Sequence, residues 1–477
     1  MGIPIMIVGT SSDAGKTLIS TVICNHLTEL GFKVAPFKMQ NMSLNSMCSI
    51  EGGEMSVAQY IQAIACKKLP SVRFNPILLK PENGKTYVIF NGKYYNKYSP
   101  KDYMSDRKKE FFDKGINILN QLLDKNDYVI IEGAGSPAEV NLMKYDITNM
   151  AVAKAVKAHT IIVTDINLGG SFASIVGTME IFNEEEKNLV KGFIFNKYYG
   201  KKEMLDDGLK YLLDKYNKPT LGIVPYAKHN IPDEDSMKKW NFESGDIDIR
   251  IIKTPHISNF ADFDPLSWKN GIKYIEKPDN SIPDLLIIPG SKSTVEDLKW
   301  LRINGFDDYI LKCKQNNSII MGICGGFQML TENIEDNFEN NENIEGIGLI
   351  PLKTIFKKEK ITGIKKGYLN FLNSNYDIEG FEIRHGHTET NDHYFCTIKD
   401  INGNEYKDGF IKENVIGTYM HGLFNNDHFT DDFLNFLRTK KGLSIKKYNS
   451  YSLYDQINNF SKEISKHINF EDILSWH

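Results

Sequence analysis

The stretch Ile319–Gln328 reads IIMGICGGFQ, an apolar run that ends on a cysteine enclosed by glycines and resumes as a helix. The apolar residues predict a buried strand, and the glycines allow the sharp strand-to-helix turn that exposes a nucleophile. Cys324 would lie near a helix N-terminus, whose partial positive charge favours the thiolate. A buried structural cysteine is the alternative. The flanking glycines favour a nucleophile elbow.

The whole chain has the composition of a folded globular protein. Its 477 residues indicate two or three domains, and 57 basic against 61 acidic residues give a formal net charge of −4. That balance offers no electrostatic case for nucleic acid or membrane partners and leaves the oligomeric state undetermined. The six cysteines lack metal or disulfide spacing, no signal peptide precedes the first strand, and no apolar segment approaches 18 residues. We therefore expect a cytoplasmic protein.

A phosphate-binding loop follows the first apolar strand, residues 3–8. Residues 9–17 read GTSSDAGKT and lead into a helical apolar pattern, which is the strand, loop and helix setting that such a loop requires. Lys16 would reach the β- and γ-phosphates, and the Thr17 hydroxyl would bind Mg²⁺. The first glycine, Gly9, lies one residue earlier than usual, and Thr10 occupies its place. The nucleotide-binding residues predicted in and near this loop are Thr10, Asp13, Gly15, Lys16, Thr17 and Asn196.

Polar residues follow several predicted strands of the N-terminal half. Strands at 33–37, 128–131, 160–164 and 191–195 alternate with helices, which predicts an α/β, doubly wound and mostly parallel sheet. Ligands of such sheets gather beyond the carboxyl ends of the strands. Glu132 would hold Mg²⁺ opposite the loop threonine, together with Glu51, and Asn196 would contact an adenine edge.

Substrate contacts are predicted at two further strand ends of this half. The amide-rich loop after the strand at 33–37 supplies Lys38, Asn41 and Asn45, and Lys80 ends another apolar strand. Each of these residues could instead be a solvated surface group.

The C-terminal half repeats the α/β pattern around the cysteine. Strands at 247–252 and 285–288 precede the elbow, and the second ends in PGSKST, where Gly290 or Ser291 could offer a backbone N–H to an oxyanion. His421 follows another short strand and is the predicted base for Cys324. Gln328 is among the first residues of the helix after the elbow.

Two further features of this half are a pair of histidines and a segment rich in asparagine and glutamate. His385 and His387 alternate as metal ligands do, but no further ligand completes a zinc set. The Asn- and Glu-rich residues 333–345 predict a mobile loop.

The irregular charged residues 231–246 predict a domain boundary. The expected division is residues 1–245 for the nucleotide domain, 246–445 for the cysteine-containing domain and 446–477 for a helical docking tail with apolar residues at helical spacing.

Several separated motifs together resemble the cobyric acid synthase family of glutamine-hydrolysing enzymes of the cobalamin pathway. Besides the loop and the elbow, they are PFKMQNMSLN at 36–45, NPILLKP at 75–81, EGAGSPAE at 132–139, PHISNFADF at 255–263, PGSKST at 289–294 and GTYMHGLF at 417–424. The likeness runs from about residue 3 to about residue 440. The N-terminal half is also similar to dethiobiotin synthetase, and the C-terminal half to class I glutamine amidotransferases, whose domain is flavodoxin-like.

This resemblance implies an ATP- and Mg²⁺-dependent amidoligase with glutamine, ATP and a corrinoid polycarboxylate as small-molecule substrates. The implied reaction amidates the b, d, e and g carboxylates of adenosylcobyrinic acid a,c-diamide through acyl phosphates, using ammonia from a Cys324 and His421 glutaminase site. The resemblance also implies that Gly290, Gly325 and Gln328 bind the oxyanion or the glutamine at this site. A sheltered passage for ammonia between the domains is expected, because free ammonia is mostly protonated at neutral pH.

The chain departs from related patterns in three places. His421 is followed by Gly422 and Leu423, without the Pro-Glu that supplies an orienting carboxylate in many class I amidotransferases, so we predict a Cys–His dyad. Arg384 replaces a family histidine, with His385 one place later. The chain has Asn167 and Leu168 where the family often has Asp-Arg, so an arginine suited to an anionic partner is missing.

Two rival functions share parts of this pattern. Cobyrinic acid a,c-diamide synthase has both halves and the same chemistry, but the loop at 38–46 favours the cobyric acid synthase assignment. A partition-type ATPase would carry a signature lysine where Thr10 and Ser11 stand, and it has no use for a cysteine elbow.

Overall fold

The computed structural model describes residues 1–82, 84–103, 107–229, 231–232, 245–337, 342–390, 392–399 and 403–476. The chain forms two compact units. Residues 1–43, 53–234 and 452–477 make the first, and residues 44–52 and 235–451 make the second. The predicted boundary at 245 adjoins residues 233–244, which lie outside the described residues.

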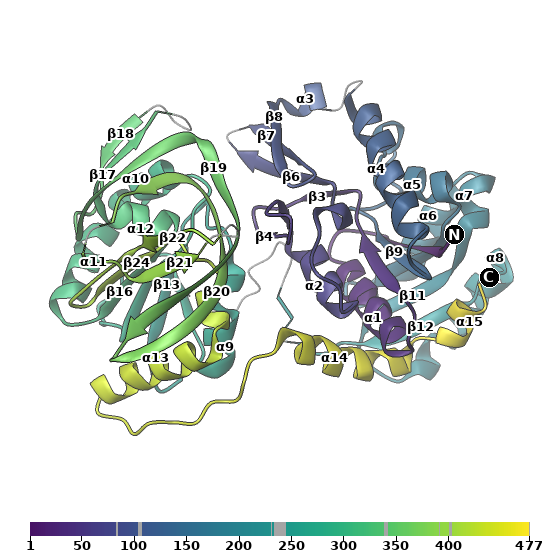
Figure 1. The fold of residues 1–477 in the computed structure, drawn as a ribbon. Helices are drawn as coiled ribbons and strands as arrows, with labels where there is room; N and C mark the ends of the chain where they lie inside the picture. Colours follow the sequence, from purple (N-terminus) through teal and green to yellow (C-terminus); the bar gives the residue numbers. More distant parts are fainter. Residues whose placement is uncertain are drawn as a thin grey trace. The chain divides into compact units, whose positions relative to one another are not determined.

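The first unit is built on a six-stranded sheet in the order β12-β11-β10-β1-β9-β2 (Figure 1). All its neighbouring strands are parallel. Its strands are β1 (Ile3–Gly9), β2 (Val34–Phe37), β9 (Tyr128–Glu132), β10 (His159–Asp165), β11 (Val190–Tyr198) and β12 (Thr220–Pro225). These strands are nearly continuous apolar runs because both faces of the sheet are buried. Their carboxyl ends share one edge, as predicted for a doubly wound sheet.

Helices and a smaller sheet complete the first unit. The helices of the sheet layers are α1 (Lys16–Glu29), α2 (Val57–Ala65), α4 (Arg107–Leu123), α5 (Met150–Val156), α6 (Ser171–Ile181), α7 (Glu184–Leu189) and α8 (Asp206–Tyr216). The smaller sheet has the order β3-β6-β7-β8. It consists of β3 (Gln40–Met42), β6 (Ile77–Glu82), β7 (Lys85–Phe90) and β8 (Lys93–Tyr98).

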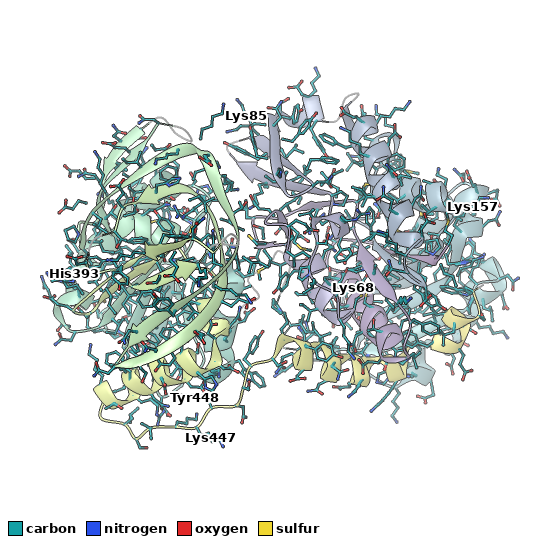
Figure 2. The ribbon with its side chains drawn as sticks, viewed as in Figure 1. Lys68, Lys85, Lys157, His393, Lys447 and Tyr448 are labelled. Atoms are coloured by element: carbon teal, nitrogen blue, oxygen red, sulfur yellow. The ribbon has the colours of Figure 1, made fainter. Side chains whose placement is uncertain are left out.

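The end of the chain returns to the first unit after the second unit is complete. Helix α14 (Leu453–Ile464) packs along α1 with Ile457 and Ile464 buried, and α15 (Phe470–Leu474) follows it (Figure 1). Ile468 forms an isolated antiparallel bridge with Gly222 at the edge strand β12. Before this return, Tyr448 is buried in the core of the second unit, whereas the adjacent Lys447 is exposed (Figure 2). The expected helical tail is thus an integral part of the first unit from residue 452.

The second unit contains its own six-stranded sheet, in the order β14-β13-β15-β16-β24-β23. The strands are β13 (Ile249–Ile252), β14 (Lys273–Ile275), β15 (Leu285–Ile288), β16 (Ile319–Ile323), β23 (Phe410–Lys412) and β24 (Val415–Thr418). Only the edge pair β23 and β24 is antiparallel in this sheet. The accompanying helices are α9 (Asp264–Lys269), α10 (Thr294–Ile303), α11 (Phe306–Gln315), α12 (Gly325–Leu330) and α13 (Asp427–Lys440).

A second sheet in this unit includes a long hairpin that the sequence did not predict. Its strands are β17 (Thr331–Asp336), β18 (Glu342–Glu345), β19 (Ile350–Phe371), β20 (Ser374–Thr388), β21 (Cys396–Lys399) and β22 (Glu405–Asp408). The mobile loop predicted at 333–345 is wrong where the structure describes it, because β17 and β18 pair there as antiparallel strands. Residues 338–341 lie outside the described residues.

A short N-terminal segment, residues 44–52, belongs to the second unit. It contains β4 (Ser46–Cys48). Asn259 Nδ2 donates to the Ser46 carbonyl at 2.9 Å, and Thr362 Oγ1 donates to the Gly52 carbonyl at 2.7 Å. These bonds satisfy backbone groups of the segment inside the second unit. None of the helices among the described residues is both long and apolar enough to cross a membrane.

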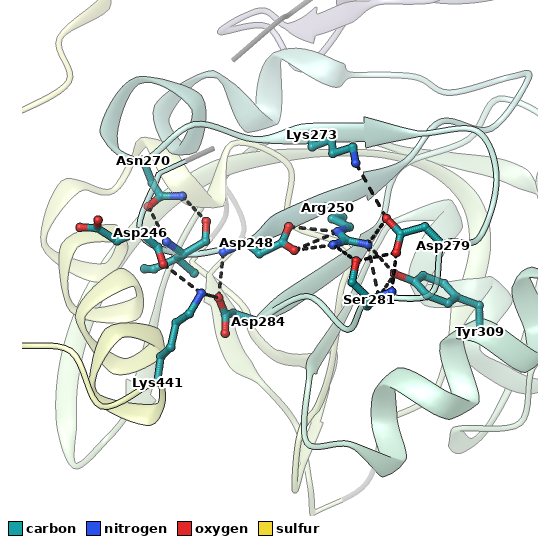
Figure 3. Close-up of polar contacts among 11 residues, drawn as sticks. Asp246, Asp248, Arg250, Asn270, Lys273, Asp279, Ser281, Asp284, Tyr309 and Lys441 are labelled. Carbon is teal, nitrogen blue, oxygen red and sulfur yellow. Dashed lines mark hydrogen bonds and ion pairs between the residues drawn. The ribbon is translucent and has the colours of Figure 1, made fainter. Parts of the chain in front are cut away.

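A buried arginine gathers polar groups near the start of β13 (Figure 3). Arg250 Nε donates to both Asp248 oxygens, at 3.0 and 3.1 Å, and Nη1 lies 2.7 Å from Asp279 Oδ2. Its guanidinium also donates to Ser281 Oγ at 2.6 Å and to the Tyr309 hydroxyl at 3.0 Å. The Ser281 hydroxyl bond, reinforced by Arg250, lowers the pKa of Asp279 to about 2 despite partial desolvation. This cluster holds the loop before β15 against β13 and α11.

We expect Arg250→Met to lower the free energy of unfolding of the protein by about 2–4 kcal/mol, because two carboxylates lose their counter-charge. We expect the loss to be near the lower end of this range, because Asp248 and Asp279 are partly exposed and water screens their charges. Because the folded-state pKa of Asp279 is below its usual value, its contribution is complete above about pH 4 and is lost as the pH falls toward 2. Urea unfolding at pH 7 and pH 3 measures both effects. Lys253→Met, which removes an exposed pair with Glu276, should change stability by less than about 1 kcal/mol. Equal losses for the two variants would contradict the assignment.

Candidate active site

Cys324 occupies the sharp turn between β16 and α12. Its backbone has φ 50° and ψ −106°, a conformation that a non-glycine residue adopts only under constraint. A side chain at Gly326 would collide with the Ile288 carbonyl oxygen, 1.9 Å from the Cβ position, so the turn requires a glycine there. The cysteine therefore has the geometry of the predicted nucleophile elbow.

His421 lies beside the cysteine and is held by a third side chain. Its Nδ1 is 2.7 Å from Oδ2 of Asp262, and the other carboxylate oxygen of Asp262 accepts the Gly422 backbone N–H at 2.8 Å. His421 is 1% exposed and Asp262 is 4% exposed, so this pair is screened from water. The prediction of a Cys–His dyad is wrong. The orienting carboxylate comes from the loop after β13 rather than from a residue next to the histidine.

The charge state of His421 follows from these neighbours. Burial alone would lower its pKa, but the Asp262 carboxylate and the Cys324 sulfur outweigh burial and raise the pKa of His421 to about 10. The imidazolium is therefore the form that faces the sulfur at neutral pH. Because Asp262 occupies Nδ1, the Nε2 proton is the one available to a reacting group.

Strand β20 forms a wall over this pair. Phe381 and His421 exchange backbone hydrogen bonds at 3.0 and 2.9 Å, and their rings stack with centroids 5.2 Å apart. The Ile383 carbonyl oxygen lies 3.7 Å from Cys324 Sγ. The backbone of β20 thereby fixes the imidazole plane and limits the space around the thiol.

The loop after β15 brings backbone N–H groups to the elbow. A Cβ atom at Gly290 would lie 3.0 Å from His421 Cε1, and one at Gly325 would lie 2.7 Å from the Ser291 nitrogen. The structure thus places the two predicted oxyanion residues, Gly290 and Gly325, beside the histidine and the cysteine. Ser291 N–H joins them as a candidate donor.

Gln328 lies in a buried row of polar side chains behind the elbow. Its Oε1 accepts from Thr294 Oγ1 at 3.0 Å, and its Nε2 lies 3.5 Å from the Tyr419 hydroxyl, which is 2.7 Å from Thr388 Oγ1. Arg384 stacks on Tyr419 with its guanidinium carbon 4.0 Å from the ring centroid. These side chains form the inner side of the site around Cys324.

The departure at Arg384 has a structural explanation. Arg384 is buried, donates to the Gly386 carbonyl at 2.7 Å and pairs with Glu382 at 3.3 Å. His385 instead contacts the Lys357 carbonyl at 3.1 Å. The histidine therefore does not take the buried position next to Tyr419.

The predicted phosphate loop lies between β1 and α1. Gly15 caps α1 in the left-handed region, and Lys16 Nζ donates to the Ser11 carbonyl at 3.0 Å. A Cβ at Gly9 would lie 3.0 Å from Lys16 Nζ, so the early glycine leaves room for the lysine to fold over the loop. Thr10 Oγ1 donates to Thr164 Oγ1 at 3.0 Å, which ties the loop to the end of β10.

Two residues near the end of β11 support this loop. Asn196 Nδ2 donates to the Ala14 carbonyl at 3.0 Å, and Lys197 Nζ donates to the Asp13 carbonyl at 2.7 Å. Lys197 also pairs with Asp165 at 2.7 Å. Asn196 therefore lies at the nucleotide loop, where it supports the backbone, and its contact with an adenine edge stays a prediction.

Glu132 is the centre of a buried polar cluster at the same sheet edge. One of its oxygens accepts from Thr17 Oγ1 and from Lys38 Nζ, each at 2.9 Å. The other accepts from Gln62 Nε2 at 2.5 Å. The predicted metal residues Thr17 and Glu132 are thus together, and the predicted substrate residue Lys38 is their neighbour.

The other predicted ligand residues are divided between the units. Asn41 is buried in the first unit, as is Lys80, which pairs with Glu54 at 2.5 Å. Asn45 and Glu51 lie in the segment 44–52 of the second unit. A shared role of Glu51 with Thr17 and Glu132 therefore stays a prediction. Among the described residues, no three His, Cys, Asp or Glu side chains cluster as metal ligands.

Sequence reasoning missed Asp262, Gln62 and Tyr419. Asp262 lies in the quoted motif at 255–263, where a carboxylate between two phenylalanines was the available signal for a buried functional role. Gln62 was visible only as an amide on a helix, and Tyr419 only as a neighbour of His421. Their contacts depend on packing between segments distant in sequence.

Each half of the chain matches a known protein family. Residues 5–238 match the CobQ/CobB/MinD/ParA nucleotide binding domain, and residues 248–429 match the CobB/CobQ-like glutamine amidotransferase domain. A solved structure of PurLQS from Thermotoga maritima covers 40% of this chain and 100% of its own, with 18% identity and a TM-score of 0.33, which is too low to support an argument.

Two curated relatives cover nearly the whole chain. A probable cobyric acid synthase of Thermococcus gammatolerans is 50% identical over 99% of each chain. A cobyric acid synthase of Clostridium novyi is 45% identical over 92% of this chain and 90% of its own. With this identity over its length and both matching domains, the chain belongs to the cobyric acid synthase family.

Proposed function

We propose that this protein is a cobyric acid synthase, which amidates the b, d, e and g carboxylates of adenosylcobyrinic acid a,c-diamide with ATP and glutamine. The observation that carries the proposal is the presence, in one chain of this family, of a Cys324 elbow paired with His421 and Asp262 and of a phosphate loop facing Glu132. The first set suits amide hydrolysis, and the second suits phosphoryl transfer.

In the glutaminase reaction, the Cys324 thiolate attacks the side-chain amide carbon of glutamine and forms a C–S bond. The carbonyl oxygen becomes an oxyanion, which the backbone N–H groups of Ser291 and Gly325 bind; the closeness of these two residues supports this assignment. The His421 imidazolium gives its Nε2 proton to the departing nitrogen as the C–N bond breaks, so ammonia leaves. Water, deprotonated by His421, then cleaves the thioester and releases glutamate.

Asp262 supports both proton transfers. It keeps Nδ1 of His421 protonated and directs Nε2 toward the sulfur and the leaving group. Its negative charge also stabilises the imidazolium, which is the acid needed for ammonia departure.

In the synthetase reaction, a corrinoid carboxylate oxygen attacks the γ-phosphorus of ATP, and ADP leaves. The carboxylate needs this activation because it is a poor acylating agent at neutral pH. Lys16 and the loop backbone bind the phosphates, and Lys38 lies beside Glu132, where a cation suits an incoming carboxylate. Ammonia then attacks the acyl phosphate, and inorganic phosphate leaves as the amide forms.

Mg²⁺ fits the oxygen donors at this site. Thr17 Oγ1 and Glu132 Oε1 are 2.9 Å apart, and Mg²⁺ is commonly held by one or two protein oxygens together with phosphate oxygens and water. When bound there, Mg²⁺ neutralises charge on the phosphates.

The function is tested by incubating the protein with ATP, Mg²⁺, glutamine and the a,c-diamide and following product masses over time. We expect four successive conversions of carboxyl to amide. No conversion of the a,c-diamide, with amidation of the unamidated ring instead, would assign the protein as cobyrinic acid a,c-diamide synthase. Turnover of ATP without any amide product would favour a partition-type ATPase.

We expect Cys324→Ala to abolish glutamine-dependent amidation, because the variant lacks the thiol that forms the thioester. Ammonium at high pH should restore amide formation, since the synthetase residues are unchanged. Product masses with each nitrogen donor measure this. Cys313→Ala, which removes another buried thiol of the same unit, should keep activity with glutamine. Absence of ammonium rescue would argue against separable half-reactions.

We expect Asp262→Asn to lower kcat for glutamine hydrolysis by roughly 10²- to 10⁴-fold, because the histidine loses its orienting carboxylate. The variant should also shift the alkaline limb of the pH–rate profile to lower pH. The reason is that Asp262 helps to raise the pKa of His421 to about 10, and without it the imidazolium deprotonates earlier. Glutamate release across pH 6–10 measures both effects. Asp308→Asn, an exposed change of equal charge, is the control. An unchanged alkaline limb would contradict the assignment.

A further inference from the structure

Asp297, in the first turn of α10, is a buried carboxylate that the glutaminase mechanism does not use. It is 0% exposed. Its Oδ2 accepts the Ser291 hydroxyl at 2.6 Å, and its Oδ1 accepts the His256 backbone N–H at 3.1 Å and lies 2.8 Å from His256 Nδ1. One carboxylate thus binds two loops that are distant in sequence, the loop after β13 and the loop after β15.

These two loops also pair with each other through their backbones. Ile257 and Ser291 form an antiparallel bridge, and Lys292 N–H donates to the His256 carbonyl at 2.9 Å. Ser258 N–H donates to the Gly290 carbonyl, also at 2.9 Å. The ladder fixes the position of the peptide group that joins Gly290 to Ser291.

The direction of the Ser291 N–H follows from the planarity of that peptide. In a trans peptide the C=O and the N–H point in opposite directions. Because the Gly290 carbonyl points to Ser258, the Ser291 N–H points away from Ser258. Gly325 lies against this peptide, because a Cβ atom built there would be 2.7 Å from the Ser291 nitrogen. The Ser291 N–H is thus turned away from the loop after β13, at a nitrogen that lies close to the residue after Cys324.

We infer that Asp297 is a positioning residue of the glutaminase site, which holds Ser291 so that its backbone N–H binds the oxyanion formed on Cys324. The inference rests on the proposed glutaminase reaction. Asp297 touches neither glutamine nor the thiol and acts through the Ser291 side chain. Two contacts to His256 anchor the carboxylate, and the contact to Ser291 transmits its position to the donor.

A role in stability alone is the competing explanation, and two reactions of the same thiol separate the two roles. Glutamine hydrolysis passes through a tetrahedral oxyanion and needs the donor. Alkylation of Cys324 by iodoacetamide displaces iodide at a saturated carbon and forms no oxyanion. A positioning residue for the donor should affect the first reaction and spare the second.

The experiment uses the full-length chain and the variant Asp297→Asn. We expect kcat for glutamate release to fall roughly 10- to 100-fold, less than for direct loss of a donor, with KM within about threefold. Alkylation of Cys324, corrected with Cys324→Ala, should stay within about twofold of the unmodified rate. Glu296→Gln removes a carboxylate from the same helical turn and should change neither rate, because Glu296 pairs with Lys299 instead.

Two results would overturn the inference. The first is an unchanged kcat, and the second is a parallel fall in hydrolysis and alkylation, which indicates a general disturbance of the site. If Asp297→Asn does not fold, Ser291→Ala decides, since it removes the hydroxyl, with its contacts to Asp297 and to the Ser293 N–H, and keeps the backbone donor. For that variant we expect kcat to fall with unchanged alkylation, and no fall overturns the inference. Failure of the unmodified protein to hydrolyse glutamine would instead refute the proposed function.

Discussion

The hydrogen bond between Asp262 and His421 is the interaction on which the proposed glutaminase site depends. It joins the loop after β13 to the loop after β24, while Cys324 stands at the end of β16 between them in the sheet. Three parallel strands thus bring Asp262, Cys324 and His421 to one edge of the sheet. Burying a carboxylate and an imidazolium is costly unless they are paired and hydrogen-bonded, and both conditions are met here.

The first unit uses a buried carboxylate in a different way. Glu132 accepts hydrogen bonds from a threonine hydroxyl, an ammonium group and a side-chain amide. These bonds hold its carboxylate in one orientation before any ligand binds. Such preorganisation favours phosphoryl transfer, in which the protein mainly positions reactants and balances charge. Each unit thus has a buried carboxylate beside a cationic side chain. In the proposed reactions, Asp262 supports proton transfer and Glu132 supports charge neutralisation.

The sequence predicted the parts of the fold that depend on local pattern. The apolar run before the phosphate loop predicted β1, and the apolar run before the cysteine elbow predicted β16. Each pattern also predicted the turn and the helix that follow the strand, because these elements are encoded by neighbouring residues. The family assignment followed from the order of separated motifs, and the curated relatives confirm it.

Features that depend on long-range packing could not be predicted in this way. Nothing near His421 indicates that its carboxylate partner lies 159 residues earlier. The sequence did not predict the antiparallel pair of β17 and β18, because the asparagine and glutamate residues in this segment are common in loops. The feature that indicated strands was the two isoleucines, Ile334 and Ile344, which lie opposite each other in this pair. The allocation of residues 44–52 to the second unit likewise depends on partners such as Asn259 and Thr362.

The return of residues 452–476 to the first unit has a consequence for biosynthesis. Ribosomes make a chain in order, and domains generally fold as they emerge. Helix α1 is among the first elements made, yet α14, which packs along it, is made only after the entire second unit. The apolar surface of the first unit that α14 covers therefore stays exposed until the second unit has been synthesised. Nascent chains of this protein consequently have a specific need for protection from aggregation that a simple tandem of two independent domains would not have.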